Sequence, residues 1–418
     1  MNRKAWAWAG YDWANSAFPT VISTFVIAAY FAQAIAPDPA TGQAQWGVMQ
    51  ALVGLTVALA SPLLGAIADA GGRRRLMLAL ATVLTAAATA LIWFARPEAE
   101  FALLALVAVG VASVAFEIAT VFYNAMLPQV APAGRIGRVS GLAWGLGYAG
   151  GLACLALCLV LLVQPNPSPF GLDRGAAEHV RATALLVAAW MLVFGLPLLL
   201  LLPDPPGARP ALGVAMARGS AEIIALVRAL PRERLLGRFL LARLFYTDGL
   251  NTLFAFGAIY AAGVFGMGFE QILLFGIAMN VSAGLGAAAF ALVEDRVGAR
   301  RVVLGALVAI IGLGTGLLLA PDVTWFWGLA LALGLFFGPA QAASRSFMAQ
   351  IAPPDRMAAH FGLFALSGRI TGFAGPAALA AVTAATDSQR LGMATVVLFL
   401  AVGAAILATV HPLERRPA

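Results

Sequence analysis

Long apolar stretches alternate with short polar segments along the chain. Each stretch holds about 20 residues or more with few charges, which is long enough to cross roughly 30 Å of hydrocarbon. Because backbone groups in hydrocarbon must be hydrogen-bonded internally, these stretches are predicted to be helices. We predict twelve spans, at residues 8–35, 46–68, 76–95, 101–124, 138–163, 182–202, 238–264, 271–293, 302–320, 325–348, 358–384 and 391–411.

The longest polar interruption, rich in proline and arginine, divides the predicted spans six and six. We therefore predict an N-terminal six-helix bundle at 1–202, an interbundle segment at 203–237 and a C-terminal six-helix bundle at 238–418. Within the interbundle segment, apolar residues recur at helical spacing opposite charged ones, as in a helix lying on a membrane surface. A simple tether is the alternative. The apolar positions are Leu212, Met216, Ile223, Leu226, Val227 and Leu230.

Composition agrees with a membrane protein. Of 418 residues, 61% are hydrophobic and 11% are charged, and the mean hydropathy is +0.90, whereas soluble domains have about 25% charged residues. The fold class predicted is an all-α membrane protein. The segment Met1–Ala34 resembles a signal peptide, but its apolar region is too long and contains Asp12, so we interpret it as an uncleaved first span.

The distribution of arginine and lysine predicts the orientation. If both termini are cytoplasmic, 19 of the 26 basic residues fall in cytoplasmic segments, as the positive-inside rule requires. These basic groups flank spans and form no groove-sized patch, so the net charge of +7 does not indicate nucleic-acid binding. The 19 residues are Arg3, Lys4, Arg73, Arg74, Arg75, Arg135, Arg138, Arg209, Arg218, Arg228, Arg232, Arg234, Arg238, Arg296, Arg300, Arg301, Arg356, Arg415 and Arg416.

The two halves carry repeated motifs. The segment 129–135, Gln-Val-Ala-Pro-Ala-Gly-Arg, follows the fourth span and matches 350–356, Gln-Ile-Ala-Pro-Pro-Asp-Arg, after the tenth. Gly141-Leu142 matches Gly362-Leu363 at the same offset. Repeated bundles with a site between them at mid-membrane are a recurring plan of secondary transporters. The repeats therefore predict such a transporter.

The loop after the second span, 65–75, reads Gly-Ala-Ile-Ala-Asp-Ala-Gly-Gly-Arg-Arg-Arg, and a second copy occupies 291–301. Both copies resemble the signature loop of the major facilitator superfamily, although Ala70, Ala291 and Ala299 depart from its pattern. The resemblance implies a conformational latch, in which an Asp and Arg residues bridge neighbouring helix ends in one conformation. The predicted latch residues are Gly65, Asp69, Gly72, Arg73, Arg74, Asp295, Arg296, Gly298 and Arg300.

A narrower resemblance rests on three segments: 11–18 (Tyr-Asp-Trp-Ala-Asn-Ser-Ala-Phe), 246–252 (Tyr-Thr-Asp-Gly-Leu-Asn-Thr) and 345–363. They resemble the autophagy-related vacuolar amino-acid effluxer branch of the superfamily and its bacterial relatives. The resemblance covers most of the chain and implies amino-acid export. In the superfamily architecture, the first, second, fourth and fifth spans of each half border the central cavity.

Six Asp, Glu and Arg residues lie inside predicted spans, away from the span ends, and all are on cavity-type spans in that architecture. Such residues mark functional sites because a charge at membrane depth needs water or a partner. Asp12 and Asp248 could carry a proton or could bond neighbouring helices, and Glu117 could carry a proton or neutralise Arg345. Arg369 could bind a substrate carboxylate or pair with Asp248, and Arg243 is predicted to snorkel toward the cytoplasm.

Other polar and aromatic residues of the same spans are candidate cavity-lining groups, with core packing as the alternative. They are Asn15, Tyr123, Asn124, Trp144, Tyr148, Tyr246 and Asn251. On the fifth span, glycines permit close helix approach. These are Gly141, Gly145, Gly147, Gly150 and Gly151.

The sequence offers little for metal or nucleotide chemistry. The three histidines are far apart, no phosphate-binding glycine loop is present, and Cys154 and Cys158 are expected to pack without a disulfide. We therefore predict a cofactor-free, monomeric transporter rather than an enzyme, located in a bacterial inner membrane. Its partners are a small polar or zwitterionic solute, protons and the lipid bilayer. The alternatives are multidrug or lipid-like efflux and a non-transporting membrane sensor.

Overall fold

The computed structural model describes residues 1–204 and 210–410, and helices make up nearly all of that part. It contains twelve helical segments long and apolar enough to cross a membrane, so the predicted all-α class and span number are confirmed. The calls on Arg209, His411, Arg415 and Arg416 lie outside the described residues.

The first six spans end shortly before the polar interruption. The first span combines α1 (Arg3–Asn15), η1 (Phe18–Phe25), α2 (Ile27–Tyr30) and η2 (Phe31–Ile35). The next five are α3 (Pro39–Gly71), α4 (Arg74–Leu91) with η3 (Ile92–Phe94), η4 (Ala99–Phe101) with α5 (Ala102–Ala125), α7 (Ile136–Cys158) with η5 (Leu159–Val163), and α8 (Glu178–Leu201). The short helices α6 (Leu127–Val130) and η6 (Pro169–Gly171) lie in connections.

The second six spans follow helix α9 (Leu212–Ala229). They are α10 (Arg234–Phe265), α11 (Phe269–Val297), α12 (Ala299–Leu318), α13 (Val323–Ile351), η7 (Pro354–Arg356) with α14 (Met357–Arg369) and α15 (Ala374–Thr386), and α16 (Gln389–Ala408). The eleventh span is thus interrupted between Arg369 and Ala374, where backbone turns replace the helix.

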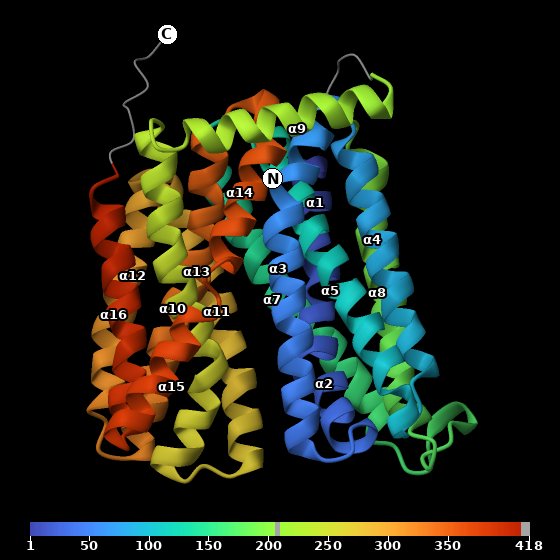
Figure 1. The fold of residues 1–418 in the computed structure, drawn as a ribbon. Helices are drawn as coiled ribbons and strands as arrows, with labels where there is room; N and C mark the ends of the chain where they lie inside the picture. The colour runs from blue at the N-terminus through green and yellow to red at the C-terminus, as the bar shows by residue number, and fades with distance from the viewer. Residues whose placement is uncertain (205–209, 411–418) are drawn as a thin grey trace.

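The helices form two bundles that meet mainly near one face of the molecule, where α9 runs across both (Figure 1). We call this face the α9 side. Two helix pairs, α3 with α14 and α7 with α11, make the principal contacts between the bundles. Toward the opposite face the ribbons of the two bundles lie farther apart (Figure 1).

Glycines allow this close approach. A Cβ on Gly65 of α3 would lie 2.3 Å from the Ala358 carbonyl oxygen of α14, and a Cβ on Gly362 would lie 2.4 Å from the Ser61 carbonyl oxygen. On α7, Gly137 and Gly141 contact α11 in the same way. The predicted close packing of the fifth span therefore serves the junction between the bundles. In contrast, Gly147, Gly150 and Gly151 pack against the first span within the N-terminal bundle.

Helix α9 rests on α3 through small and aliphatic residues. Gly219 lies against the backbone of Ile67, and Ile223 and Leu226 are buried. The chain before α9 is also tied to the end of α3, because Arg73 donates to the Pro210 carbonyl at 3.2 Å. The helix therefore covers the closed junction between the bundles (Figure 1).

Candidate functional site

A polar cavity of about 470 Å³ lies between the bundles and is lined by residues of both. Nine of the twelve residues predicted for proton coupling or substrate binding line it: Asp12, Asn15, Glu117, Asn124, Trp144, Tyr148, Asn251, Arg345 and Arg369. The cavity lies where the repeat argument places it, because α1, α5 and α7 face α10, α13 and α14 across it.

Arg345 of α13 forms the most extensive polar contact between the bundles. Its Nη1 lies 3.0 Å from Asp12 Oδ2 of α1, and its Nη2 donates to the Ser140 carbonyl of α7 at 2.7 Å. Its Nε donates to Ser140 Oγ at 2.9 Å, and that hydroxyl donates back to the Ala342 carbonyl of α13. Because the Arg345 side chain is only 1% exposed, removing its partner would leave a buried charge.

Aromatic rings surround the same guanidinium. Its carbon lies 4.7 Å from the centre of the Trp8 ring, 4.9 Å from Trp144 and 5.6 Å from Tyr123. Trp8 and Tyr123 are themselves stacked, with ring centres 4.3 Å apart. Cation–π attraction strengthens when water is excluded. Arg345 is therefore held in the N-terminal bundle by one carboxylate and three rings.

A second ion pair between the bundles joins Glu117 of α5 to Arg369, the last residue of α14. This pair is more exposed, with 18% of the Glu117 side chain and 41% of the Arg369 side chain accessible. The sequence-based alternatives that paired Glu117 with Arg345, or Arg369 with Asp248, are wrong. Arg345 pairs with Asp12, and Glu117 pairs with Arg369.

Arg243 is the third arginine of the cavity, and the prediction that it snorkels toward the cytoplasm is wrong. It is 8% exposed, its Nη1 donates to the Phe364 carbonyl and to Ser367 Oγ, and its guanidinium lies 3.4 Å from the Phe364 ring centre. No carboxylate of the described residues is paired with it. The cavity lining thus contains three guanidinium groups and two carboxylates.

Three predicted site residues lie outside the cavity lining. Tyr123 contacts Arg345 from within the N-terminal bundle, and the Tyr246 hydroxyl is bonded to Ser344 Oγ at 2.8 Å. Asp248 is buried between α10 and α15, where its Oδ2 accepts the Gly375 N–H at 2.9 Å. It therefore caps the start of α15 and forms no ion pair with Arg369.

The first latch loop bridges the bundles on the α9 side. Asp69, at the end of α3, accepts the N–H groups of Ala358 and Ala359 at 3.2 and 2.9 Å, so it caps α14 of the other bundle. Arg74 Nε lies 2.5 Å from Asp69 Oδ1, and Arg74 Nη2 donates to the Pro354 carbonyl at 2.8 Å. The Arg74 and Asp69 side chains are buried, at 6% and 1% exposed.

The second latch loop is looser. Asp295, near the end of α11, accepts the Arg138 N–H of α7 at 3.1 Å, and the Arg138 Nε lies 3.8 Å from its other oxygen. Arg300 bonds the Leu407 and Ala408 carbonyls of its own bundle, and Arg296 is exposed. Both loops turn at a glycine in the left-handed region, Gly72 at φ +58° and Gly298 at φ +90°.

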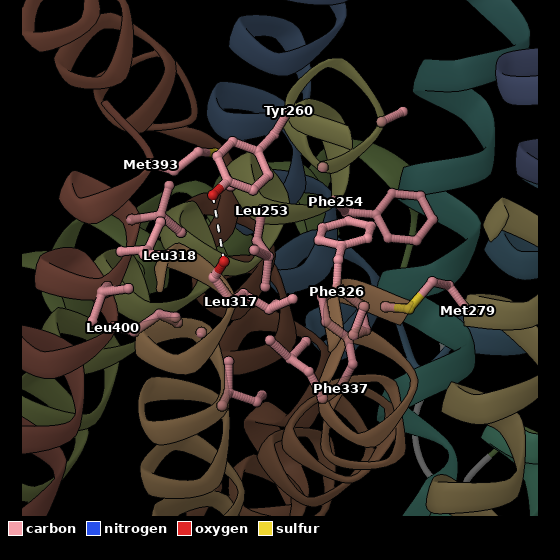
Figure 2. Close-up of a pocket in the computed structure, with 18 of the residues that line it drawn as sticks. Leu253, Phe254, Tyr260, Met279, Leu317, Leu318, Phe326, Phe337, Met393 and Leu400 are labelled. Carbon is pink, nitrogen blue, oxygen red and sulfur yellow. Dashed lines mark hydrogen bonds between the residues drawn. The ribbon is translucent and has the colours of Figure 1, made fainter. Parts of the chain in front are cut away.

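A separate apolar pocket of about 100 Å³ lies inside the C-terminal bundle. Figure 2 shows Phe254, Phe326 and Phe337 on one side of it and Leu318 and Leu400 on the other, with the Tyr260 hydroxyl bonded to the Leu317 carbonyl. None of the described residues that line this pocket is charged. It is smaller than the roughly 300–1,000 Å³ of typical small-molecule sites.

No group of three or more His, Cys, Asp or Glu among the described residues could hold a metal ion. Cys154 and Cys158 are free and buried, as predicted. The cavity lining presents guanidinium, amide and carboxylate groups.

Comparison with known proteins decides the family. The family model described as "Vacuole effluxer Atg22 like" matches residues 43–135 and 131–416. The chain belongs to this Atg22-like family. A "MFS-type transporter YxiO" of Bacillus subtilis is 26% identical over 97% of this chain and 94% of that protein. Autophagy-related protein 22 of Cryptococcus neoformans is 26% identical over 65% of this chain, which spans about half that protein's length.

Solved structures agree on the fold. The fucose:proton symporter FucP of E. coli in its outward conformation superposes with a TM-score of 0.77 at 16% identity, covering 98% of each chain. The proton:xylose symporter XylE superposes with a TM-score of 0.70 at 14% identity, covering 98% of this chain and 95% of that one. This Atg22-like protein is thus a multi-pass transporter of the major facilitator superfamily, not an enzyme.

Sequence analysis missed several cavity residues of the Atg22-like protein. Uncharged polar residues of the lining were not predicted because, within apolar helices, they give no periodic signal. They are Ser16, Thr20, Thr24, Thr120, Thr247, Asn280 and Gln341.

Proposed function

We propose that this protein is a proton-coupled secondary transporter of a zwitterionic, amino-acid-like solute. The observation that carries the proposal is the charge of the cavity, whose lining has one more guanidinium than carboxylates. A solute carboxylate would neutralise this excess. Arginine suits the role because its planar donors match a carboxylate in two hydrogen bonds.

Arg369 and Arg243 are the proposed carboxylate-binding pair. Arg369 is the most exposed of the three cavity arginines, and Arg243 has only neutral partners. The amide groups of Asn251, Asn280 and Gln341 line the same cavity and offer carbonyl oxygens to an ammonium group. A zwitterion could therefore place its carboxylate on the arginines and its ammonium group on the amide oxygens.

Transport would proceed by alternating access. In the present conformation the bundles are joined on the α9 side by both latch loops and by Asp12–Arg345. Opening that side requires these contacts to separate and the contacts of the opposite side to form. Rocking of repeated bundles around a fixed midplane site is the general behaviour of such folds.

Protons would act on the two ion pairs that cross the cavity. Protonation of Asp12 or Glu117 removes the negative partner of Arg345 or Arg369 and so weakens the connection between the bundles. Asp248 lies apart from the cavity, and we therefore assign coupling to Asp12 and Glu117. FucP and XylE are proton symporters, which supports coupling in this fold without identifying the solute.

We further propose that the α9 side is cytoplasmic in a bacterial inner membrane and that the protein works as a monomer. The α3–α4 connection and the start of α4, with Arg73, Arg74 and Arg75, lie on this side, as do the start of α7 and helix α9, which fits the positive-inside rule. The relative from Bacillus subtilis supports the bacterial membrane.

The test is flux of radiolabelled amino acids into proteoliposomes, with candidates first selected by a thermal-shift screen. We expect binding of a zwitterion, flux driven by a proton gradient, and loss of that gradient dependence in Asp12→Asn. Gradient-independent flux in the wild type would contradict coupling. Preferential binding of lipophilic cations that survives Arg369→Ala would favour multidrug efflux, and binding without flux would favour a sensor.

A further inference from the structure

One buried carboxylate at the junction of the bundles is used neither by the cavity nor by the latches. Glu294 of α11 precedes the latch residue Asp295, and the corresponding position of the first loop is Ala68. Glu294 is 3% exposed, and its Oε1 has no hydrogen-bond partner. It also forms no ion pair with any residue that the structure describes.

Glu294 lies directly on the other bundle. Its side-chain carbons are 2.6–2.8 Å from the position that a Cβ on Gly137 of α7 would occupy. The side chain is therefore covered by the first turn of α7 and excluded from water only while α7 and α11 are in contact. Because the α7–α11 contact joins the two bundles, the burial of Glu294 depends on closure of the α9 side.

The charged groups around Glu294 have other partners. On its own helix lies Asp295, which bonds Arg138 of α7. From α13 come Arg345 and the Ser346 hydroxyl. The donors of Arg345 contact Asp12, Ser140 and Asn124. Neither Arg138 nor Arg345 therefore forms an ion pair with Glu294.

An unpaired ionised carboxylate in such a place costs several kcal/mol, whereas the neutral acid does not. We propose that Glu294 binds one proton when the bundles close on the α9 side and releases it to the water of that side when they open. Acid on the α9 side then favours the closed conformation, and rising pH favours the open one. The proposal rests on the alternating access described above.

Double electron–electron resonance in lipid nanodiscs can measure this equilibrium without a solute. Spin labels would replace Ala133, before α7, and Val297, at the end of α11, in a Cys154→Ser/Cys158→Ser background; both positions are exposed. One linked proton changes the ratio of open to closed molecules by up to tenfold per pH unit. Other acids at the junction add their own dependence, so the test is the difference between variants.

We expect Glu294→Gln and Glu294→Ala to lose one linked proton. The ratio of open to closed molecules should then change less with pH than in the wild type, by a factor of up to ten per pH unit. Glu294→Ala reproduces the residue of the first loop and covers the case in which glutamine packs badly. Glu270→Gln is the matched control, because Glu270 lies at the exposed far end of the same helix. It should keep the wild-type slope.

An unchanged slope in both Glu294 variants would overturn the proposal. Failure of amino-acid flux would not overturn this proposal, because the distance measurement needs no substrate. Conversely, an unchanged slope with intact proton-driven flux would remove only the role of Glu294. The two proposals can therefore fail separately.

Discussion

The two latch loops occupy equivalent places in the bundles, yet they differ in strength. Asp69 and Asp295 each cap the first turn of a helix from the opposite bundle, α14 and α7 respectively. The Asp69 carboxylate is 1% exposed and has the Arg74 guanidinium at 2.5 Å, whereas Asp295 is 12% exposed and the nearest guanidinium nitrogen, Arg138 Nε, is at 3.8 Å. The same motif therefore yields a buried network in one half and a looser contact in the other.

This difference teaches how a duplicated motif can specialise. The first loop holds the bundles through a buried network of Asp69 and Arg74, and the second combines a weaker cap with the neighbouring carboxylate of Glu294. We therefore expect the first loop to contribute more to closure of the α9 side than the second. The predictions that follow are ordered from the largest expected effect to the smallest.

The largest effect is expected for Asp69→Asn. The substitution leaves the buried Arg74 guanidinium without its carboxylate, which costs about 3–5 kcal/mol in the closed conformation. The closed population should collapse, as measured by the distance between labels at positions 133 and 297. A closed population like that of the wild type would remove Asp69 as the principal latch.

Glycine substitutions should differ between the two junctions. In Gly65→Ala the new methyl group meets the backbone carbonyl of Ala358 at 2.3 Å, which cannot be relieved by a side-chain rotation. In Gly137→Ala it meets the Glu294 Cδ and Cγ at 2.6 and 2.7 Å, which can move by side-chain rotation, and the Glu294 Cβ at 2.8 Å, which cannot. Overpacking costs about 1–3 kcal/mol, so Gly65→Ala should open the α9 side more than Gly137→Ala. The reverse order in the label distances would contradict the comparison.

A smaller effect is expected for Asp295→Asn. The pair with Arg138 is partly exposed and long, and such pairs contribute about 0.2–1 kcal/mol. The population of closed molecules should fall by no more than a few-fold under the same conditions as for Asp69→Asn. An effect as large as that of Asp69→Asn would show that the loops are equivalent.

The smallest effect is expected for Arg300→Ala. Arg300 donates to carbonyls at the end of α16 in its own bundle, so its loss should leave the label distances unchanged. A modest decrease in thermal stability is expected because those carbonyls lose their donors. A shift of the label distances toward the open state would place Arg300 in the latch.

Much of the fold could be predicted, because span length and hydropathy are properties of local sequence. The repeats and the resemblance together pointed to a cavity between two bundles, and nine of the twelve proposed cavity residues line it. The choice of partners could not be predicted. Whether Arg345 pairs with Asp12 or with Glu117 depends on how α13 rotates against α1 and α5, and sequence spacing does not fix rotation between distant helices.

Glu294 illustrates the other limit. It follows the predicted eighth span, 271–293, and stands beside Asp295 and Arg296, so its sequence position does not indicate burial. In the structure α7 covers it at Gly137, which is more than 150 residues away in the sequence. The sequence around Glu294 gives no sign that the helix packed against it has a glycine at the point of contact.

The central claim is that the bundles rock around the polar cavity, so that one side opens as the other closes. Two label pairs test it most directly: Ala133 with Val297 on the α9 side, and Ala40 with Gln271 on the opposite side, all exposed positions. In Asp69→Asn we predict that the first distance lengthens and the second shortens relative to the wild type. If both distances change in the same direction, or the second stays fixed while the first lengthens, the account is contradicted.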